Sequence, residues 1–347
     1  MSTKEALTHL GWRPHFQAQV EPEDERSPAR VMNVHRGRVE VAMETGSASI
    51  ELHGRSAAMG LTVGDWVLLD ADHSQVMERL EPFGRFQRRA AGTGGEIQSI
   101  AANVDTLFIV TSANRDFNVA RLERYLAIAH DAGAFPIIVI TKADLTDTPE
   151  DFVEPASKLS PGILVEPLDA RDPAQVVVLS SWCGEGQTVA LLGSSGVGKS
   201  TIINTLSGSE QYTHQAREDD QRGRHTTTSR SMHKLEEGGW LVDTPGMREL
   251  QLVDIGDALD DVFSDVAEFA AGCRFADCGH ESEPGCSVQA AIVDGELDPD
   301  RLRRYRKLQS EDRRNTETLA ERRSRDKSLG KFYKSVLSEK KNRKGGP

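Results

Sequence analysis

The sequence of 347 residues lacks any long hydrophobic run. No stretch has the roughly 18 consecutive apolar residues that a transmembrane helix needs. Residues 1–20 also lack the apolar core of a secretory signal peptide. We therefore expect a cytoplasmic protein that is neither exported nor embedded in a membrane. The length is sufficient for two or three domains whose cores need no disulfide bonds.

Cysteine is scarce as well, with four residues in the chain. Three of them crowd into the segment from Cys273 to Cys286, beside His280, whereas Cys183 lies far away. This spacing suits a metal site in a reducing compartment better than disulfide bonds. We expect Cys183 to be a small, buried hydrophobic residue.

Positive charge is deficient over most of the chain, whose net charge is −12. Residues 301–347 hold 17 Lys and Arg against 6 Asp and Glu, which is a net charge of +11 and leaves −23 for the first 300 residues. An acidic body with a basic tail suggests a polyanionic partner for the tail. A solvated helix with i,i+4 ion pairs is the alternative that stays open.

The most specific motif is the segment Gly-Ser-Ser-Gly-Val-Gly-Lys-Ser at 193–200, which matches G-x-x-x-x-G-K-S/T. An apolar run at 188–192 precedes it and a helix-like run at 201–206 follows, as a phosphate-binding loop requires. Its backbone N–H groups would cradle a phosphate chain, Lys199 would reach the β- and γ-phosphates, and Ser200 would ligate Mg²⁺. A turn that binds nothing is the disfavoured alternative. The candidate residues are Gly193, Ser194, Ser195, Gly196, Val197, Gly198, Lys199, Ser200 and Thr201.

A second motif follows a predicted strand, helix and strand at 106–111, 119–131 and 135–140, an order that indicates a doubly wound parallel sheet. Thr141-Lys142-Ala143-Asp144 matches N/T-K-x-D, the guanine-reading loop of GTP-binding proteins. Asp144 would accept from N1–H and the 2-amino group of guanine, and Lys142 would lie along the base. By itself the tetrapeptide also fits an ordinary helix N-cap, but beside a phosphate loop it predicts guanine binding.

Asp169-Ala170 follows a short predicted strand at 163–165, where the S-A-x loop that backs the guanine would lie. The aspartate in place of serine departs from the usual pattern.

Two signals downstream of the phosphate loop concern Mg²⁺ and the γ-phosphate. Asp243-Thr244-Pro245-Gly246 matches D-x-x-G, in which Asp243 would hold Mg²⁺ through a water and the Gly246 N–H would donate to the γ-phosphate. In the polar segment 207–231 a threonine should complete the Mg²⁺ shell. We assign this role to Thr227, with Thr226 as the alternative. The segment also fits a surface loop that is disordered without nucleotide.

The order of these motifs is unusual, because the guanine loop precedes the phosphate loop and D-x-x-G comes last. Such an order indicates a circular permutation, which a sheet tolerates when the new ends lie in surface loops. Many GTPases carry a glutamine after D-x-x-G to orient the attacking water, but this chain has Met247 there. His225 is the candidate for that task, and a solvated loop histidine is its alternative.

A metal site is predicted from the spacing of Cys273, Cys278, His280 and Cys286. Three thiolates and one imidazole make a closed tetrahedral Zn²⁺ site with no position left for catalysis. The loop between them is poor in apolar residues, so the metal would supply its folding energy. Reduced core cysteines near an unrelated histidine are the alternative. Helices are expected at 257–270, 288–292 and 298–323.

Short strands separated by glycine turns over residues 29–89 indicate a small closed barrel. An OB-type barrel would bind nucleic acid, although a purely structural barrel fits these residues nearly as well. The candidate contacts are Phe83, Arg85, Phe86, Arg88 and Arg89.

Together these features resemble the ribosome small-subunit-dependent GTPase A family over about residues 29–306. The resemblance rests on the permuted order, Gly223-Arg224-His225-Thr226-Thr227, Asp243-Thr244-Pro245-Gly246, the stretch from Cys273-Arg274-Phe275 to Pro284-Gly285-Cys286, and Ile100-Ala101-Ala102-Asn103-Val104-Asp105. It implies late maturation of the 30S subunit, GTP hydrolysis stimulated by that subunit, OB and zinc domains that touch rRNA, and a water-orienting role for His225. Asp169 and an extension at 1–28, which has no assigned role, depart from the family.

We therefore predict a multidomain protein with an N-terminal OB-type β-barrel, a central α/β circularly permuted P-loop GTPase domain and a C-terminal, mainly helical zinc-binding domain. The expected boundaries are an N-terminal extension at 1–28, the barrel at 29–98, the GTPase domain at 99–255, the zinc-binding domain at 256–325 and a basic tail at 326–347. The expected ligands are GTP or GDP, Mg²⁺ and one structural Zn²⁺. The expected partners are the 30S subunit and its rRNA, with no membrane, for a monomeric protein.

Three other classes of function compete with this prediction. One is a zinc and OB protein that binds nucleic acid and uses GTP only as a passive binding switch. A P-loop ATPase or kinase is the second, which Asp144 opposes. A hydrolase that uses the zinc is least favoured, because four protein ligands leave no place for water.

Overall fold

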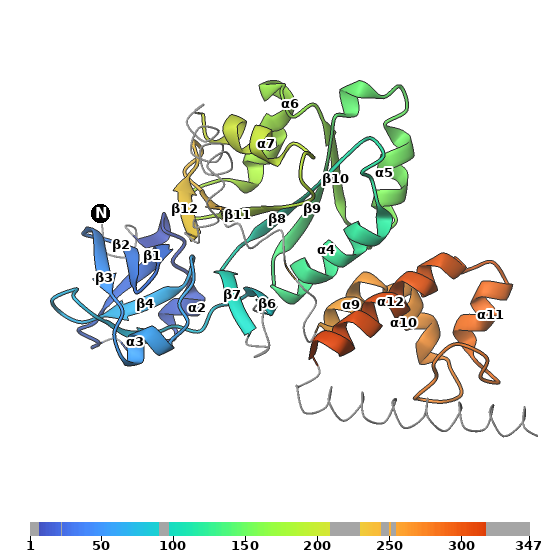
Figure 1. The fold of residues 1–347 in the computed structure, drawn as a ribbon, viewed down its shortest axis with the longest axis horizontal. Helices are drawn as coiled ribbons and strands as arrows, with labels where there is room; N and C mark the ends of the chain where they lie inside the picture. Colours follow the sequence, from blue (N-terminus) through green and yellow to red (C-terminus); the bar gives the residue numbers. More distant parts are fainter. Residues whose placement is uncertain are drawn as a thin grey trace, which may run out of the picture.

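The computed structural model describes residues 7–21, 23–89, 97–208, 230–243, 250 and 255–316. Within them the chain forms a barrel-like group of strands, a mixed sheet flanked by helices, and a group of helices (Figure 1). The predicted switch residues His225, Thr226, Thr227 and Gly246 lie outside the described residues, as does the basic tail. In the described part of the chain, no helix is long and apolar enough to span a membrane.

The N-terminal strands form the expected barrel-like antiparallel unit. β1 lies at its centre, because it pairs antiparallel with both β2 and β4. Side chains that alternate along the strands, such as Val39 and Val41 of β2, are fully buried inside it. The elements are β1 (Ser27–His35), β2 (Arg38–Met43), β3 (Gly46–Glu51), α3 (Arg55–Ala58), β4 (Trp66–Leu69) and β5 (Val76–Arg79).

A hairpin of β6 (Arg85–Arg89) and β7 (Ile97–Ala102) connects the barrel to the central sheet. Ala101 of β7 forms an isolated bridge with Val63, so the hairpin also contacts the barrel. The domain boundary that we expected between residues 98 and 99 falls within β7.

The central sheet contains five parallel strands in the order β10-β9-β8-β11-β13. Every residue of β8 is buried, since helices cover both faces of the sheet. Leu107 and Phe108 of that strand belong to the hydrophobic clusters on opposite faces. These strands are β8 (Thr106–Ser112), β9 (Phe135–Thr141), β10 (Leu164–Leu168), β11 (Thr188–Leu192) and β13 (Trp240–Asp243).

β12 (Arg230–Lys234) closes this order as an antiparallel neighbour of β13. It also pairs with β1 through Asn33 and Ser231, so the barrel and the parallel strands share one continuous sheet of 11 strands. The helices along the sheet are α4 (Val119–Asp131), α5 (Glu150–Ser157), α6 (Pro173–Val176) and α7 (Lys199–Leu206), with the 3-10 helices η1 (Ala143–Leu145) and η2 (Val177–Trp182).

Residues 7–20 form a segment that we call the N-terminal strap, which includes α2 (Pro14–Gln17). Trp12 and Phe16 of the strap pack against Trp66 of the barrel, with ring centroids 4.7 and 5.7 Å from it. On its other side, the strap's His9 carbonyl accepts from Trp240 Nε1 of β13 at 2.8 Å. The strap, which belongs to the extension without an assigned role, thus joins the barrel to the parallel strands.

Arg30 of β1 reinforces this junction from inside. Its Nη1 donates to the carbonyl of Leu10 in the strap at 2.5 Å, and its Nη2 donates to Thr188 Oγ1 of β11 at 2.8 Å. Burial lowers the pKa of Arg30 to about 10, so the guanidinium stays charged at neutral pH. One side chain therefore links three segments.

The C-terminal helices are α9 (Gly256–Val262), α10 (Ser264–Ala271), α11 (Ser287–Val293) and α12 (Pro299–Thr316). Our expectation of a single helix over 257–270 is wrong, because the chain leaves the helical conformation at Phe263, with φ −106° and ψ 41°. The break places the Phe263 ring in the core, where it packs 5.3 Å from the Tyr305 ring. Periodicity alone did not reveal this break, since both halves keep an apolar face.

Candidate functional site

The candidate nucleotide loops all follow the carboxyl ends of parallel strands, so they meet at one edge of the sheet. Two glycines of the phosphate loop are required by its geometry. A Cβ on Gly193 would lie 2.2 Å from the Val110 carbonyl oxygen of β8, and Gly198 has a φ of +99°. The loop therefore packs against the neighbouring strand and turns directly into α7.

Lys199, the first residue of α7, folds back over this loop. Its Nζ donates to the carbonyl oxygens of Gly193 at 2.8 Å and Ser194 at 2.5 Å. Ser200 follows on the exposed side of the helix start, and Thr201 is half-buried. The ammonium group is thus held above the backbone that would cradle phosphates.

The structure brings the predicted guanine loop into contact with the phosphate loop. Thr141 Oγ1 lies 2.6 Å from the Val197 carbonyl oxygen, and Lys142 Nζ donates to the Gly196 carbonyl at 2.9 Å. Lys142 adopts a left-handed conformation, with φ +59°, that directs its side chain across the loop. These contacts join the two motifs that together predicted guanine-nucleotide binding.

Asp144, the last residue of the guanine loop, lies in the 3-10 helix η1 and is paired with Arg171, a residue that sequence reasoning missed. Arg171 Nη2 lies 2.7 Å from Asp144 Oδ2, and Arg171 Nε lies 3.0 Å from Asp169 Oδ1. The structure therefore places Asp169 beside Asp144 through a shared arginine. Ala170, which lies between Asp169 and Arg171 in the sequence, is buried. The sequence signal that could have revealed this contact is the arginine directly after Asp169-Ala170.

A second missed residue, Arg121 of α4, contacts the phosphate loop. Its Nη1 donates to Ser194 Oγ, and it also lies 3.4 Å from the Asp116 carbonyl oxygen. Lys199 and Arg121 thus bring two cationic groups to the same loop residue. No sequence signal marks Arg121, because 73 positions separate it from Ser194 and only the folded sheet brings α4 to the phosphate loop.

Asp243, the predicted Mg²⁺ residue of D-x-x-G, is the last residue of β13. β13 pairs in parallel with β11, so Asp243 and the phosphate loop lie at the same sheet edge. The remaining switch candidates, His225, Thr227 and Gly246, are outside the described residues, and their roles stay predictions.

The four predicted metal ligands lie together in the loop between α10 and α11. Their donor atoms are all within 4.8 Å of one another. Cys273 Sγ lies 3.9 Å from Cys286 Sγ, and His280 Nδ1 lies 3.5 Å from each of these two sulfur atoms. Ligands about 2.3 Å from a central ion in a tetrahedron stand roughly 3.8 Å apart, so this donor set fits a tetrahedral metal ion.

Neighbouring side chains hold the metal loop in shape. The Glu283 carboxylate accepts from the backbone N–H groups of Gly279, Glu281 and Ser282 at 2.9, 2.8 and 3.0 Å. Hydrogen bonds from its own backbone N–H first, and then from Glu281 and Gly279, lower the pKa of Glu283 to about 2. Gln289 Nε2 donates to the His280 carbonyl, which anchors the histidine from α11.

Three of the residues suggested for contact with nucleic acid are engaged by other parts of this protein. Phe86 is 2% exposed, and Phe83 packs on Phe16 of the strap with centroids 6.3 Å apart. Arg85 Nη2 forms a 2.9 Å ion pair with Asp65, whose side chain is fully buried. Burial raises the pKa of Asp65 to about 6, while the positive charge of Arg85 acts against that shift. Packing therefore engages these three side chains, whereas the Arg89 side chain lies outside the described residues.

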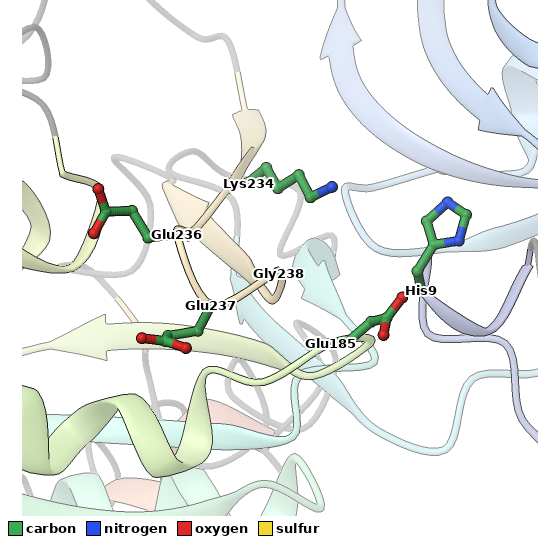
Figure 2. A pocket seen from close by; sticks show the side chains of 6 residues that line it. All are labelled: His9, Glu185, Lys234, Glu236, Glu237 and Gly238. Carbon is green, nitrogen blue, oxygen red and sulfur yellow. The ribbon is translucent and has the colours of Figure 1, made fainter.

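A polar hollow of about 370 Å³ lies away from the nucleotide loops (Figure 2). His9 of the strap and Glu185 line one part of it, and residues at the turn between β12 and β13 line the rest: Lys234, Glu236, Glu237 and Gly238. No predicted site residue lines this hollow.

Comparison with known proteins places the chain in a family. The model of the RsgA GTPase family matches residues 78–253. The chain is 47% identical to small ribosomal subunit biogenesis GTPase RsgA 2 of Vibrio parahaemolyticus over 346 residues, which is 99% of this chain and 96% of the relative. The chain belongs to the RsgA GTPase family. An RsgA protein of Mesorhizobium japonicum is 48% identical, covering 90% of this chain and 91% of the relative.

Solved structures confirm the permuted fold. The YjeQ crystal structure from Thermotoga maritima has a TM-score of 0.61 at 25% identity, covering 82% of this chain and 97% of that one. YloQ, described as a circularly permuted GTPase, has a TM-score of 0.60 at 22% identity, with coverage of 86% and 100%. As a member of the RsgA family, the chain is a GTP hydrolase, and the resemblance drawn from its motifs is confirmed.

Proposed function

We propose that this protein binds the 30S ribosomal subunit, hydrolyses GTP to GDP and phosphate when the subunit stimulates it, and then dissociates as part of late subunit maturation. The contact of Lys142 Nζ with the Gly196 carbonyl at 2.9 Å carries the guanine-nucleotide assignment, because it joins the base-reading and phosphate-binding loops. The ribosomal role is supported by the relatives named as small ribosomal subunit biogenesis GTPases.

The roles of the nucleotide-site residues follow from their chemistry. The phosphate-loop N–H groups and Lys199 would hold the β- and γ-phosphates, and Asp144 would read the guanine edge. Ser200, Thr227 and Asp243 would hold Mg²⁺, whose charge offsets the negative charge that develops on the phosphate oxygens. The Gly246 N–H would donate to the γ-phosphate, so its turn would respond to hydrolysis.

His225 is proposed to orient the attacking water, since Met247 has no hydrogen-bonding group for it. That role requires the segment around His225 to dock against the γ-phosphate. If the 30S subunit docks this segment, GTP hydrolysis would be slow in the free protein and fast on the ribosome.

The cluster of Cys273, Cys278, His280 and Cys286 is proposed to hold one structural Zn²⁺, because three thiolates and one imidazole match that ion best. Contact with rRNA is proposed for the zinc-binding part and the barrel, with the basic tail adding sequence-independent attraction to phosphates. A protein that acts on 30S subunits would work in the cytoplasm, and we propose that it does so as a monomer.

GTP hydrolysis by the purified protein, measured alone, with 30S subunits and with 50S subunits, tests this proposal. We expect strong stimulation by 30S subunits only, and no comparable hydrolysis of ATP. Tight GTP binding without turnover on 30S subunits would contradict the proposal and favour the passive binding switch. Equal hydrolysis of ATP and GTP would instead favour the P-loop ATPase.

A further inference from the structure

Arg171 bridges the two carboxylates beside the candidate guanine site. Its Nη2 lies 2.7 Å from Asp144 Oδ2 and 3.0 Å from Asp169 Oδ2, while its Nε lies 3.0 Å from Asp169 Oδ1. The fork geometry of the guanidinium thus fits one carboxylate with two donors and keeps a contact with the other.

The pairing of the backbone strands places these three side chains close together. β9 and β10 pair in parallel, with Thr141 opposite Leu168, so the loops that follow them begin side by side. The Arg171 backbone N–H also donates to Asp169 Oδ1 at 2.9 Å, which fixes the short turn between the two residues. Asp169, Arg171 and Asp144 therefore meet without any large rearrangement.

Guanine recognition places a specific demand on the Asp144 carboxylate. Both of its oxygens must lie in the plane of the base to accept from N1–H and the 2-amino group, yet the terminal torsion of aspartate is soft. A neighbouring donor can hold that torsion. A serine at position 169 would supply a hydroxyl donor, but an ionised aspartate has only acceptors and adds like charge.

Arg171 supplies the donor that Asp169 lacks and offsets the negative charge that Asp169 adds. Hydrogen bonds from Arg171 lower the pKa of Asp169, so that carboxylate remains ionised and keeps its hold on the guanidinium. The single positive charge offsets one of the two negative charges. Asp144 keeps lone pairs for the base, because an ionised carboxylate offers about four acceptor positions and Arg171 contacts one oxygen.

We propose that Arg171, anchored by Asp169, is a positioning residue that orients the Asp144 carboxylate for guanine recognition. This inference rests on the proposed guanine site. It predicts an effect on base discrimination rather than on stability, because the Arg171 side chain is 67% exposed and exposed ion pairs contribute little to folding.

The test compares the binding of GDP and of IDP, whose base lacks the 2-amino group, to the full-length protein by titration calorimetry. We expect Arg171→Ala to weaken GDP binding about tenfold and IDP binding less, so that the preference for GDP falls. Asp169→Ser combined with Arg171→Ala should recover most of the GDP preference, because the serine hydroxyl then donates to Asp144. The matched control is Lys158→Ala, which removes an exposed cation paired with Glu154 and should change neither affinity.

Two outcomes would overturn the inference. One is an unchanged GDP preference in Arg171→Ala. The other is a loss that the double variant does not recover. Because that variant restores the local net charge and a donor beside Asp144, a persistent loss would show that such a donor does not sustain the preference. Unfolding midpoints of all variants should match that of the unmodified protein.

Asp144→Asn separates this inference from the proposed function. If Asp144→Asn lowers the GDP preference while Arg171→Ala leaves it intact, the guanine site stands and only the role of Arg171 is wrong. If Asp144→Asn also leaves the preference unchanged, the guanine site itself is misassigned.

Discussion

Glu123 of α4 and Arg301 of α12 form a buried ion pair, with Oε1 2.8 Å from Nη1. The Glu123 side chain is fully buried and takes a second contact from Arg304 Nε to Oε2, also at 2.8 Å. Arg301 in turn stacks on Phe263, with its Cζ 4.2 Å from the ring centroid, and donates to the Val262 carbonyl at 2.7 Å. The C-terminal helices are therefore fastened to the helix that also carries Arg121 toward the phosphate loop (Figure 1).

Glu123→Gln should destabilise the docking of these helices by about 3 kcal/mol, because the buried Arg301 and the half-buried Arg304 both lose the Glu123 carboxylate. Urea unfolding followed by circular dichroism would measure the loss. The control is Arg303→Gln, whose exposed pair with Asp300 should be worth less than about 1 kcal/mol. Equal unfolding midpoints for the two variants would show that the buried pair does not hold the helices.

The close packing of the N-terminal strap against Arg30 predicts different effects of alanine at two glycines with similar backbone conformations. Gly11 has φ +89°, and an added Cβ would lie 2.7 Å from Arg30 Nη1 and 2.9 Å from the Gly186 carbonyl oxygen. Gly37 has φ +80° with open space around it. Gly37→Ala should cost about 1 kcal/mol through backbone strain, and Gly11→Ala about 2 kcal/mol more. Thermal unfolding of both variants measures this difference. Equal losses of unfolding free energy would contradict close packing of the strap at Gly11.

The pH dependence of stability should carry a contribution from His130 of α4. Burial lowers the pKa of His130, while the charge of Asp261 acts in the opposite direction. Below about pH 6.5 the unfolded chain therefore binds a proton more readily than the folded chain, so stability falls as the pH drops. His130→Leu should make the unfolding free energy less dependent on pH between about 5 and 7. An identical slope in both proteins would rule out this contribution.

Metal content distinguishes the clustered cysteines from the remote one. We expect purified protein to carry one Zn²⁺ per chain, Cys273→Ser to lose it, and Cys183→Ser to keep it. Cys183 is 1% exposed, and burial raises the pKa of its thiol to about 12, so it remains a neutral core residue. Elemental mass spectrometry of the three proteins gives the answer. Retention of zinc by Cys273→Ser would contradict the assigned ligand set.

His225→Ala should lower the 30S-stimulated rate of GTP hydrolysis about a hundredfold or more, because the attacking water loses its orienting group. GDP affinity should stay unchanged, since the imidazole acts on the water and not on the base. His214→Ala is the control, as it removes another histidine of the same segment. A stimulated rate that survives His225→Ala would refute the role.

The motifs that sequence reasoning found are those whose residues are close neighbours along the chain. Residues 193–200 and the four metal ligands have fixed short spacings, and the α4 bounds Val119–Asp131 agree with the predicted helix. The misplaced features depend on packing. Arg85 and Phe86 looked available for RNA because nothing in the sequence indicates that Asp65 pairs with Arg85 or that Phe86 is buried in the core beside the central sheet.

The sequence by itself determined the phosphate and guanine motifs and the metal cluster, because local spacing defines each of them, and the order of the motifs along the chain indicated the permuted GTPase fold. Tertiary structure decided the rest. Arg171 reaches Asp144 across 27 positions, and Arg301 reaches Glu123 across 178 positions. The strap likewise meets Trp240 only because β13 lies beside it in the folded chain. Such contacts arise from the register of parallel strands and the docking of helices, which are properties of the whole fold that no short stretch encodes.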